Sequence, residues 1–294
     1  MNRWNQVFIA SHKIFFIIFG LFGNVNLIYI ILSTPKLRSK SSYLQALQSL
    51  AHIFCILNSF IDVHLLLSDA QMLKESCFHV IFPIVFAFCF QTSIMLFILL
   101  DILLFVLFPT VARAFEDWKY VLGMSTLPCL WGIAIVAFGF IQEPEFRMVF
   151  MCNPPSALNR EVRKVLFPVT VVVNTLSFII FVILIILFQK KGNAQCLKAM
   201  THLQVSAALF IFSTYLNTFA VNVFVMLGYS GDDLIDLIGN ISITAMLSYS
   251  HTFYTIIWRS PEYRRRFIGL YCKTSGARVS NCEPTIVKNR SNGP

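Results

Sequence analysis

Charged residues are scarce in this sequence, since Asp, Glu, Lys and Arg make up 13% of its 294 residues. Soluble domains carry about 25%. Hydrophobic residues account for 57% of the chain, and 30 of its residues are Phe. Too little polar surface would remain to cover so much apolar material in water. The shortage of charge therefore excludes an ordinary soluble domain and predicts a polytopic membrane protein.

Motifs that carry chemistry are also missing. The chain has neither HExxH nor a Ser, His and Asp arrangement typical of hydrolases, and its eight cysteines form no CxxC or Cys/His pair at metal spacing. We therefore expect no enzyme activity, no cofactor and no metal site. Residues 235–257 contain no Lys, which excludes a retinal Schiff base there. Three acids scattered among the apolar stretches are weak support for a transporter.

Seven apolar stretches are long enough to cross a bilayer, which takes about 20 residues of helix. Because backbone polar groups find no partner in hydrocarbon, each stretch should be an α-helix. The predicted fold class is an all-α membrane protein, a seven-transmembrane helix bundle with a short amphipathic membrane-surface helix after helix seven. The stretches are 14–33, 43–67, 78–108, 120–141, 165–188, 203–227 and 235–257.

The basic residues indicate how the bundle is oriented. The net charge of +9 comes from short segments between apolar stretches, so it indicates membrane topology and lipid contact rather than nucleic acid. Sixteen Lys and Arg lie on the side of the C-terminus and seven on the other, which predicts an external N-terminus. We expect a short extracellular N-terminus (1–13), the bundle (14–258), an amphipathic juxtamembrane helix (259–272) and a disordered cytoplasmic tail (273–294).

Two cysteines, Cys77 and Cys152, are the only ones that this topology places clearly outside the cell. A bridge between them would close a loop of about 75 residues and would stabilise the fold by about 4 kcal/mol if unstrained. The alternative is a pair of free thiols. After helix seven, Ser260-Pro261-Glu262 predicts a helix start. Cys272, near the end of that helix, is either a palmitoylation site or an unmodified thiol.

Several short patterns occur in order along the predicted helices: Gly23-Asn24, Leu37-Arg38-Ser39-Lys40, Ala51 with Cys55, Cys77, Asp101 with Pro109, Cys152-Asn153-Pro154-Pro155, and Pro261-Glu262-Tyr263-Arg264-Arg265. Taken together, over about 14–272, the chain resembles the nematode serpentine chemoreceptors of the Srsx family, which are rhodopsin-like G-protein-coupled receptors. The resemblance implies a chemosensory receptor for a small molecule, coupled to a heterotrimeric G protein. It also implies a multi-pass protein of the plasma membrane, with the ciliary membrane of a sensory neuron as a more specific location.

The resemblance assigns G-protein coupling to Asp101, Ile102, Leu103, Pro109 and Tyr254. In the family, the acid that closes helix three is normally followed by Arg, whereas Asp101 is followed by Ile102. Helix seven usually ends in Asn-Pro-x-x-Tyr, of which only Tyr254 is present here. An aliphatic side chain cannot make the hydrogen bonds of Arg. The alternative function is therefore a ligand-gated seven-helix ion channel or a non-signalling receptor relative.

The family's packing also predicts an interior polar cluster of Asn24, His52, Gln91 and Ser250. Polar side chains in a membrane bundle need partners, so one interpretation is that the cluster only holds helices together. The other is that protonation of His52 acts as a switch.

For the ligand, the resemblance points to the outer halves of helices three, five, six and seven. Ile84 lies seven residues after Cys77, and Val85 and Phe88 follow it, which predicts an apolar pocket wall for small hydrophobic molecules. Asp62 and Asp236 lie in the outer halves of helices two and seven. They either contact a cationic ligand or mark solvated helix ends.

Overall fold

The computed structural model describes residues 2–110, 116–142, 146–191, 205, 208–217, 219–220, 223–224, 227–228 and 231–274, and these are mainly helical. Of these helices, five are long and apolar enough to cross a membrane. They are α1 (Arg3–Ser33), α2 (Lys40–Ser68), α3 (Lys74–Leu107), α5 (Asp117–Ile141) and α7 (Arg160–Lys191). A sixth long helix, α9 (Gly231–Arg259), covers the predicted seventh span. The predicted span 203–227 is described only in part, chiefly as the apolar helix Ala208–Asn217.

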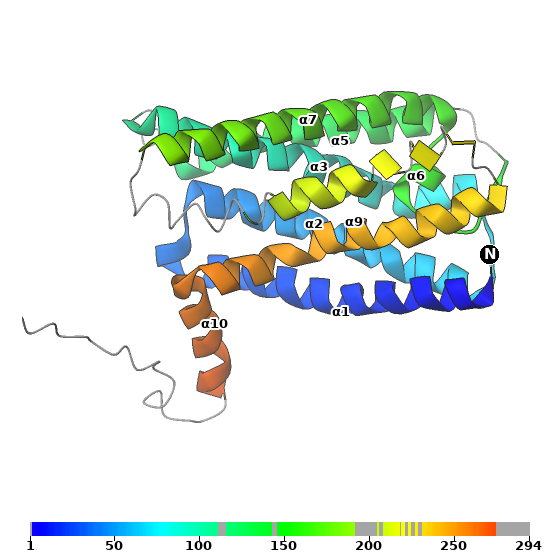
Figure 1. Cartoon of the computed structure of the whole chain (residues 1–294), viewed down its shortest axis with the longest axis horizontal. Helices are drawn as coiled ribbons and strands as arrows, with labels where there is room; N and C mark the ends of the chain where they lie inside the picture. The colour runs from blue at the N-terminus through cyan, green and yellow to red at the C-terminus, as the bar shows by residue number, and fades with distance from the viewer. Residues whose placement is uncertain are drawn as a thin grey trace, which may run out of the picture.

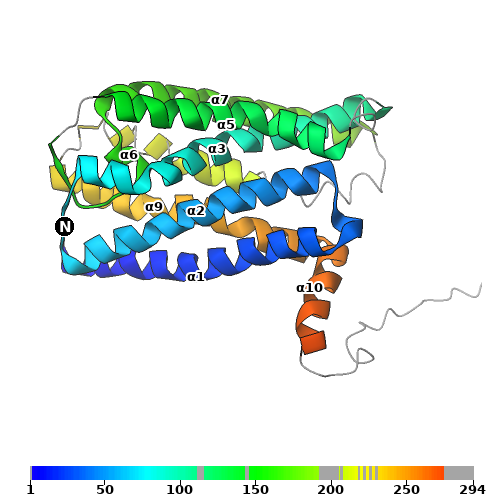
Figure 2. The same cartoon turned by 180° about the vertical axis from the view of Figure 1, so that it is seen from behind.

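The long helices lie side by side along one common direction (Figure 1). One end of the bundle, here called the disulfide end, holds the start of α1, the short helix α6 (Pro154–Ala157) and the Cys77–Cys152 bond. There the strands β1 (Met72–Leu73) and β2 (Met148–Val149) pair antiparallel, with Met72 opposite Val149. The opposite end, the α10 end, holds the 3₁₀ turn η1 (Pro35–Leu37) and the helix α10 (Pro261–Thr274). Figure 2 shows α10 turning away from the bundle axis.

The long helices begin earlier than the apolar stretches that predicted them, and α1 differs most. It begins at Arg3, inside the segment 1–13 that we expected to precede the first span. The Asn2 side chain caps it by accepting a hydrogen bond from the Trp4 backbone nitrogen at 3.3 Å. Lys13 does not end the helix because its charge is paired with Asp62. A cation whose charge is neutralised by a buried partner can therefore lie inside a membrane helix. Hydropathy alone would place the start of that helix after the cation.

The core is built around α3, which packs against α2, α5 and α7. The other main contact joins α1 to α2 and α9. Gly20 lets α1 and α9 approach closely, because a Cβ at this position would lie 2.6 Å from the Ser250 hydroxyl oxygen. These contacts give one bundle whose predicted site residues lie at three levels: the disulfide end, the middle and the α10 end.

Candidate functional site

The disulfide end is held together by the predicted bond between Cys77 and Cys152, which is present, with a Cα–Cα distance of 5.6 Å. Both cysteines are fully buried. The bond ties the first turn of α3 to the segment before α6, where the Asn153 side chain caps α6 by accepting from the Ser156 backbone nitrogen at 3.0 Å. This end of the bundle therefore has a covalently anchored connection between α5 and α7.

The residues predicted to line a ligand pocket on helix three pack below this bond. Val85 is fully buried in an apolar cluster with Cys77, Cys152 and Leu166, and Ile84 and Phe88 are half-buried against it. The cluster joins α3 to α7 and to the segment around α6. The structure thus brings these three residues to the disulfide half of the bundle, where they pack against side chains.

Asp62 and Asp236 lie in different surroundings. Asp62 Oδ2 accepts a hydrogen bond from Lys13 Nζ at 2.6 Å, and both side chains are 3% exposed, so Asp62 is not a solvated helix end. Asp236 is half-buried in the second turn of α9, and its backbone carbonyl accepts from Asn240 Nδ2 at 2.8 Å. Sequence reasoning missed the Lys13–Asp62 pair because it placed Lys13 outside the first span. The apolar residues Val7 to Ala10 before Lys13 were the available signal.

The interior polar cluster is buried, but its members do not bond mainly to one another. Asn24 Nδ2 donates to the backbone carbonyls of Gly20 at 2.9 Å and Tyr249 at 2.8 Å, which fixes α1 to α9. His52 is fully buried beside the rings of Tyr249 and Phe210, at centroid distances of 5.6 and 6.3 Å. Gln91 Nε2 donates to Thr92 Oγ1 at 3.0 Å. Ser250 lies against Gly20.

At the α10 end, Asp101 connects three helices. Its carboxylate accepts hydrogen bonds from Ser41 Oγ, in the first turn of α2, and from Tyr120 Oη, in the first turn of α5, the latter at 2.8 Å. Lys40 Nζ lies 5.1 Å from the centre of the Tyr120 ring and 3.9 Å from Asp117 Oδ1. The acid therefore positions the ends of α2, α3 and α5 relative to one another, and a cation lies over its tyrosine partner.

The other predicted coupling residues are dispersed. Ile102 is 7% exposed in the main core, Leu103 is half-buried, and Pro109 is exposed just beyond the end of α3. Tyr254 lies against α1, where its hydroxyl donates to the Phe19 carbonyl at 2.8 Å and its ring stacks on that of Phe19 at 4.2 Å. Of the five residues, Asp101 alone makes polar side-chain contacts that join α3 to its neighbours.

The predicted surface helix is present as α10 and is packed onto the bundle. Tyr263 Oη lies 3.2 Å from Ser42 Oγ, the Phe267 ring contacts that of Phe253 at 5.3 Å, and Tyr271 Oη donates to Asn26 Oδ1 at 3.0 Å. Burial raises the pKa of the Tyr263 phenol, so the hydroxyl stays protonated at neutral pH. Cys272 lies in the last turn of α10, and its side chain is outside the described residues. The tail was expected to start at residue 273, but Lys273 and Thr274 belong to α10, and the rest of the expected tail lies outside the described residues.

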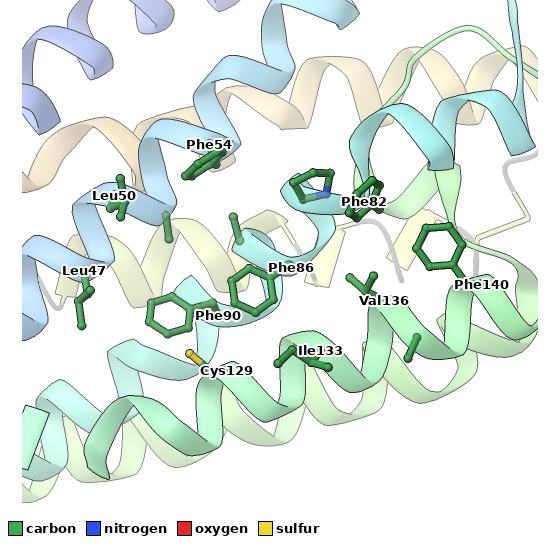
Figure 3. Close-up of a pocket in the computed structure, with 14 residues that line it drawn as sticks. Leu47, Leu50, Phe54, Phe82, Phe86, Phe90, Cys129, Ile133, Val136 and Phe140 are labelled. Atoms are coloured by element: carbon green, nitrogen blue, oxygen red, sulfur yellow. The ribbon is translucent and has the colours of Figure 1, made fainter. Parts of the chain in front are cut away.

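A groove of about 690 Å³ lies between α2, α3 and α5, and it was not predicted from the sequence. No side chain that lines it is charged or carries an amide or hydroxyl group. Figure 3 shows phenylalanine rings from α2, α3 and α5 around the space. The lining residues are Leu47, Leu50, Ala51, Phe54, Phe82, Pro83, Phe86, Ala87, Phe90, Cys129, Ile133, Val136, Ala137 and Phe140.

These features define an all-α membrane bundle with an anchored loop at one end and a three-helix polar junction at the other. The sequence model of a family described as serpentine type 7TM GPCR chemoreceptor Srsx matches residues 17–271, and the chain belongs to this family. The family and the helices confirm the predicted seven-transmembrane fold and the resemblance. The protein is thus a multi-pass membrane protein of a chemoreceptor class, which is not a class of enzymes. A search of curated proteins gives no match.

Proposed function

We propose that this chemoreceptor binds a small, largely apolar molecule and signals through a heterotrimeric G protein. The observation that carries the proposal is the family match over residues 17–271, which covers the bundle and most of α10. The apolar groove between α2, α3 and α5 supports a hydrophobic ligand, whereas Ile84, Val85 and Phe88 pack against side chains and do not line that groove. Apolar lining with few polar groups is typical of small-molecule sites.

The proposed location is the plasma membrane, with the disulfide end outside and the α10 end inside the cell; a sensory cilium is the more specific proposal. Two observations support this orientation. A buried disulfide persists in an oxidising compartment, which the cell exterior provides. Arg264, Arg265 and Arg266 on α10 add to the positive charge expected on the cytoplasmic side. Tags at the two termini should be labelled differently on intact cells, and equal labelling would contradict the orientation.

We assign the coupling surface to the α10 end around Asp101. Its two hydroxyl donors come from α2 and α5, so movement of α3 would disturb contacts with both helices. If the contacts of this junction have two discrete arrangements, the junction can transmit a change in the bundle to a cytoplasmic partner. Lys40, beside Tyr120, supplies a cation near this junction although Ile102 replaces the usual Arg.

The test is to express the full chain at the surface of cells and to apply a panel of volatile apolar compounds and small peptides. Dissociation of G-protein subunits, measured by energy transfer, together with calcium and cyclic AMP, reports coupling. We expect at least one apolar compound to give a concentration-dependent response that cells lacking the chain do not give. A surface-expressed chain that binds an apolar compound and activates no G protein would contradict the coupling proposal.

The burial of Ile102 favours a second candidate, a ligand-gated ion channel or a non-signalling relative. At 7% exposure in the core, this side chain offers neither charge nor hydrogen bonds to a G protein. Ligand-evoked current in cells whose G proteins are blocked would favour the channel. Loss of all responses under the same block would favour the receptor.

For His52, the structural interpretation has the better support. The ring is fully buried beside Tyr249 and Phe210, in the part of the core that also holds Gln91. We propose that the polar cluster mainly fixes α1, α2, α3 and α9. If His52 were instead a proton switch, His52→Ala would abolish the pH dependence of ligand potency, and an unchanged profile in that variant supports the structural role.

A further inference from the structure

The lining of the groove between α2, α3 and α5 restricts what can occupy it. Its side chains are hydrocarbon except for the thiol of Cys129. A polar group that entered would lose its hydration and gain no hydrogen-bond partner from these side chains, which costs free energy. An occupant must therefore be uncharged and present hydrocarbon to this wall.

The shape of the groove restricts the occupant further. Along α5 it extends from Cys129 to Phe140, a rise of about 16 Å at 1.5 Å per residue. Its length follows the helices and hence the bilayer normal. A volume of about 690 Å³ lies within the range of about 300–1,000 Å³ found for small-molecule sites. An elongated molecule fits better than a compact one.

The groove opens on the outside of the bundle. Phe54, Phe82 and Phe140, from three different helices, are 41%, 40% and 48% exposed along its edges. Figure 2 shows α2, α3 and α5 on the same face of the molecule. Since this face of a membrane bundle contacts lipid, a molecule dissolved in the bilayer reaches the groove sideways without crossing the disulfide end.

The inner wall of the groove belongs to the main core, and this distinguishes the groove from a surface that only touches lipid. Ala51 and Phe90 line the groove and are part of the cluster that also contains Phe210 and Tyr249. Each of the two directly precedes a member of the polar cluster, His52 and Gln91 respectively. Because the rings of Phe210 and Tyr249 lie beside His52, an occupant that presses on Phe90 acts on the packing around His52.

We propose that this groove is a ligand site entered from the bilayer, and that its ligand is an elongated, uncharged, hydrocarbon-rich molecule rather than an acyl chain of the bulk lipid. This rests on the proposed function, for which it specifies the ligand class and the place of binding. Acyl chains contact every exposed face of the bundle, whereas a ligand must prefer this one. Preference for the groove over other lipid-facing positions is thus the measurable property.

The test uses the purified full-length chain in lipid nanodiscs and a probe consisting of a decyl chain with a diazirine and a terminal alkyne. After illumination, mass spectrometry identifies the labelled peptides. We expect labelling to concentrate at groove residues such as Phe86, Cys129 and Ile133, and to decrease when unlabelled dodecane is added. Labelling spread evenly over lipid-facing residues, or unaffected by dodecane, would overturn the proposal and leave bulk lipid as the occupant.

Two matched pairs of variants in α5 sharpen the test. Ala137 and Ala134 are both exposed, but only Ala137 lines the groove. Ile133 and Leu130 are 56% and 55% exposed, and only Ile133 lines it. Ala137→Leu and Ile133→Trp should each reduce groove labelling about five-fold, equivalent to about 1 kcal/mol of binding free energy. Ala134→Leu and Leu130→Trp should not reduce it.

If all four variants fold and the two members of each pair reduce groove labelling equally, the proposal is overturned. Size-exclusion profiles and unfolding temperatures of the four variants establish that they fold. Because labelling needs no G protein, its failure is distinguishable from failure of the proposed function. A chain that activates a G protein without groove-selective labelling would retain the function and lose this site.

Discussion

Lys13 Nζ lies 2.6 Å from Asp62 Oδ2, and this buried ion pair joins α1 to α2 in the disulfide half of the bundle. Near it, Gln6 Nε2 donates to Asp69 Oδ1 at 3.0 Å, so the same two helices are linked again where α2 ends. Charges inside a membrane protein are costly unless paired. The pair therefore fixes the register of two helices whose other contacts are largely apolar.

Removing one member of this pair should strongly destabilise the bundle. Asp62→Ala leaves the Lys13 ammonium buried without its partner, and we expect a loss of about 3–5 kcal/mol. The unfolding temperature in detergent and the fraction of chain at the cell surface measure the effect. A matched control is Glu161→Ala, which breaks the exposed pair with Lys164 and should cost about 0–1 kcal/mol.

The double variant Lys13→Met with Asp62→Leu provides a second control. Replacing a buried pair by apolar side chains of similar size is often neutral or stabilising. We expect the double variant to recover most of the stability lost in Asp62→Ala. If Asp62→Ala is as stable as the unmodified chain, the pair does not hold α1 against α2.

Loss of the disulfide should reduce folded protein at the surface. Cys77→Ser opens a loop with a sequence separation of 75, and we expect a loss of about 4 kcal/mol from the entropy gained by the unfolded chain. Surface labelling of an N-terminal tag and the unfolding temperature are the measurements. Cys129→Ala removes a free, half-buried thiol without adding a polar group, and it should keep the surface level and the unfolding temperature of the unmodified chain. Normal surface levels of Cys77→Ser would contradict a stabilising role for the bond.

The hydrogen bond from Tyr120 to Asp101 should contribute to stability and to signalling. Tyr120→Phe removes one donor from a buried carboxylate, at an expected cost of about 1–3 kcal/mol. It should also shift the ligand concentration for half-maximal G-protein response, because α5 loses its polar tie to α3. Tyr29→Phe, at a half-exposed position on α1, is the matched control. A response curve for Tyr120→Phe that coincides with that of Tyr29→Phe would remove Asp101 from the proposed coupling surface.

Gly132 allows α3 and α5 to pack closely behind the groove. A Cβ there would lie 2.7 Å from Phe86 Cδ2 and 3.2 Å from the Phe86 carbonyl oxygen, so the helices would have to separate. Gly132→Ala should therefore cost about 1–3 kcal/mol through overpacking and displace the Phe86 ring. At Gly123, also in α5, a Cβ would meet nothing within 4 Å, and Gly123→Ala should preserve or raise stability. Equal unfolding temperatures for the two variants would contradict this account.

Much of the fold could be predicted because apolar runs in a membrane have one main solution. Hydrocarbon forces each run to bond its own backbone, so α2, α3, α5, α7 and α9 were found with small errors at their ends. The start of α1 was placed too late because Lys13 was treated as a boundary. A charge is tolerated there only because Asp62, 49 residues away, neutralises it, and no local pattern contains that information.

Within the candidate sites, prediction succeeded where chain order and compartment were sufficient. The role of Asp101 in coupling stays a prediction, whereas Cys77 and Cys152 followed from topology and their bond is present. The groove did not follow from topology, since α3 is apolar on nearly every face and carries no periodic signal that separates Phe86 and Phe90 from Val85 and Phe88. The contact of Tyr254 with Phe19 also has no local pattern in the sequence that would predict it.

The sequence by itself determined that this chain crosses a membrane through repeated helices, because its apolar residues are too many for water and its charges lie between the runs. Only the tertiary structure decided which faces of those helices meet. That choice depends on side-chain size and on partners far apart in the chain, such as Gly132 beneath Phe86 and Lys13 beside Asp62. In hydrocarbon all apolar faces are nearly equivalent to the solvent, so packing, and not hydropathy, distinguishes a wall of the core from a groove open to lipid.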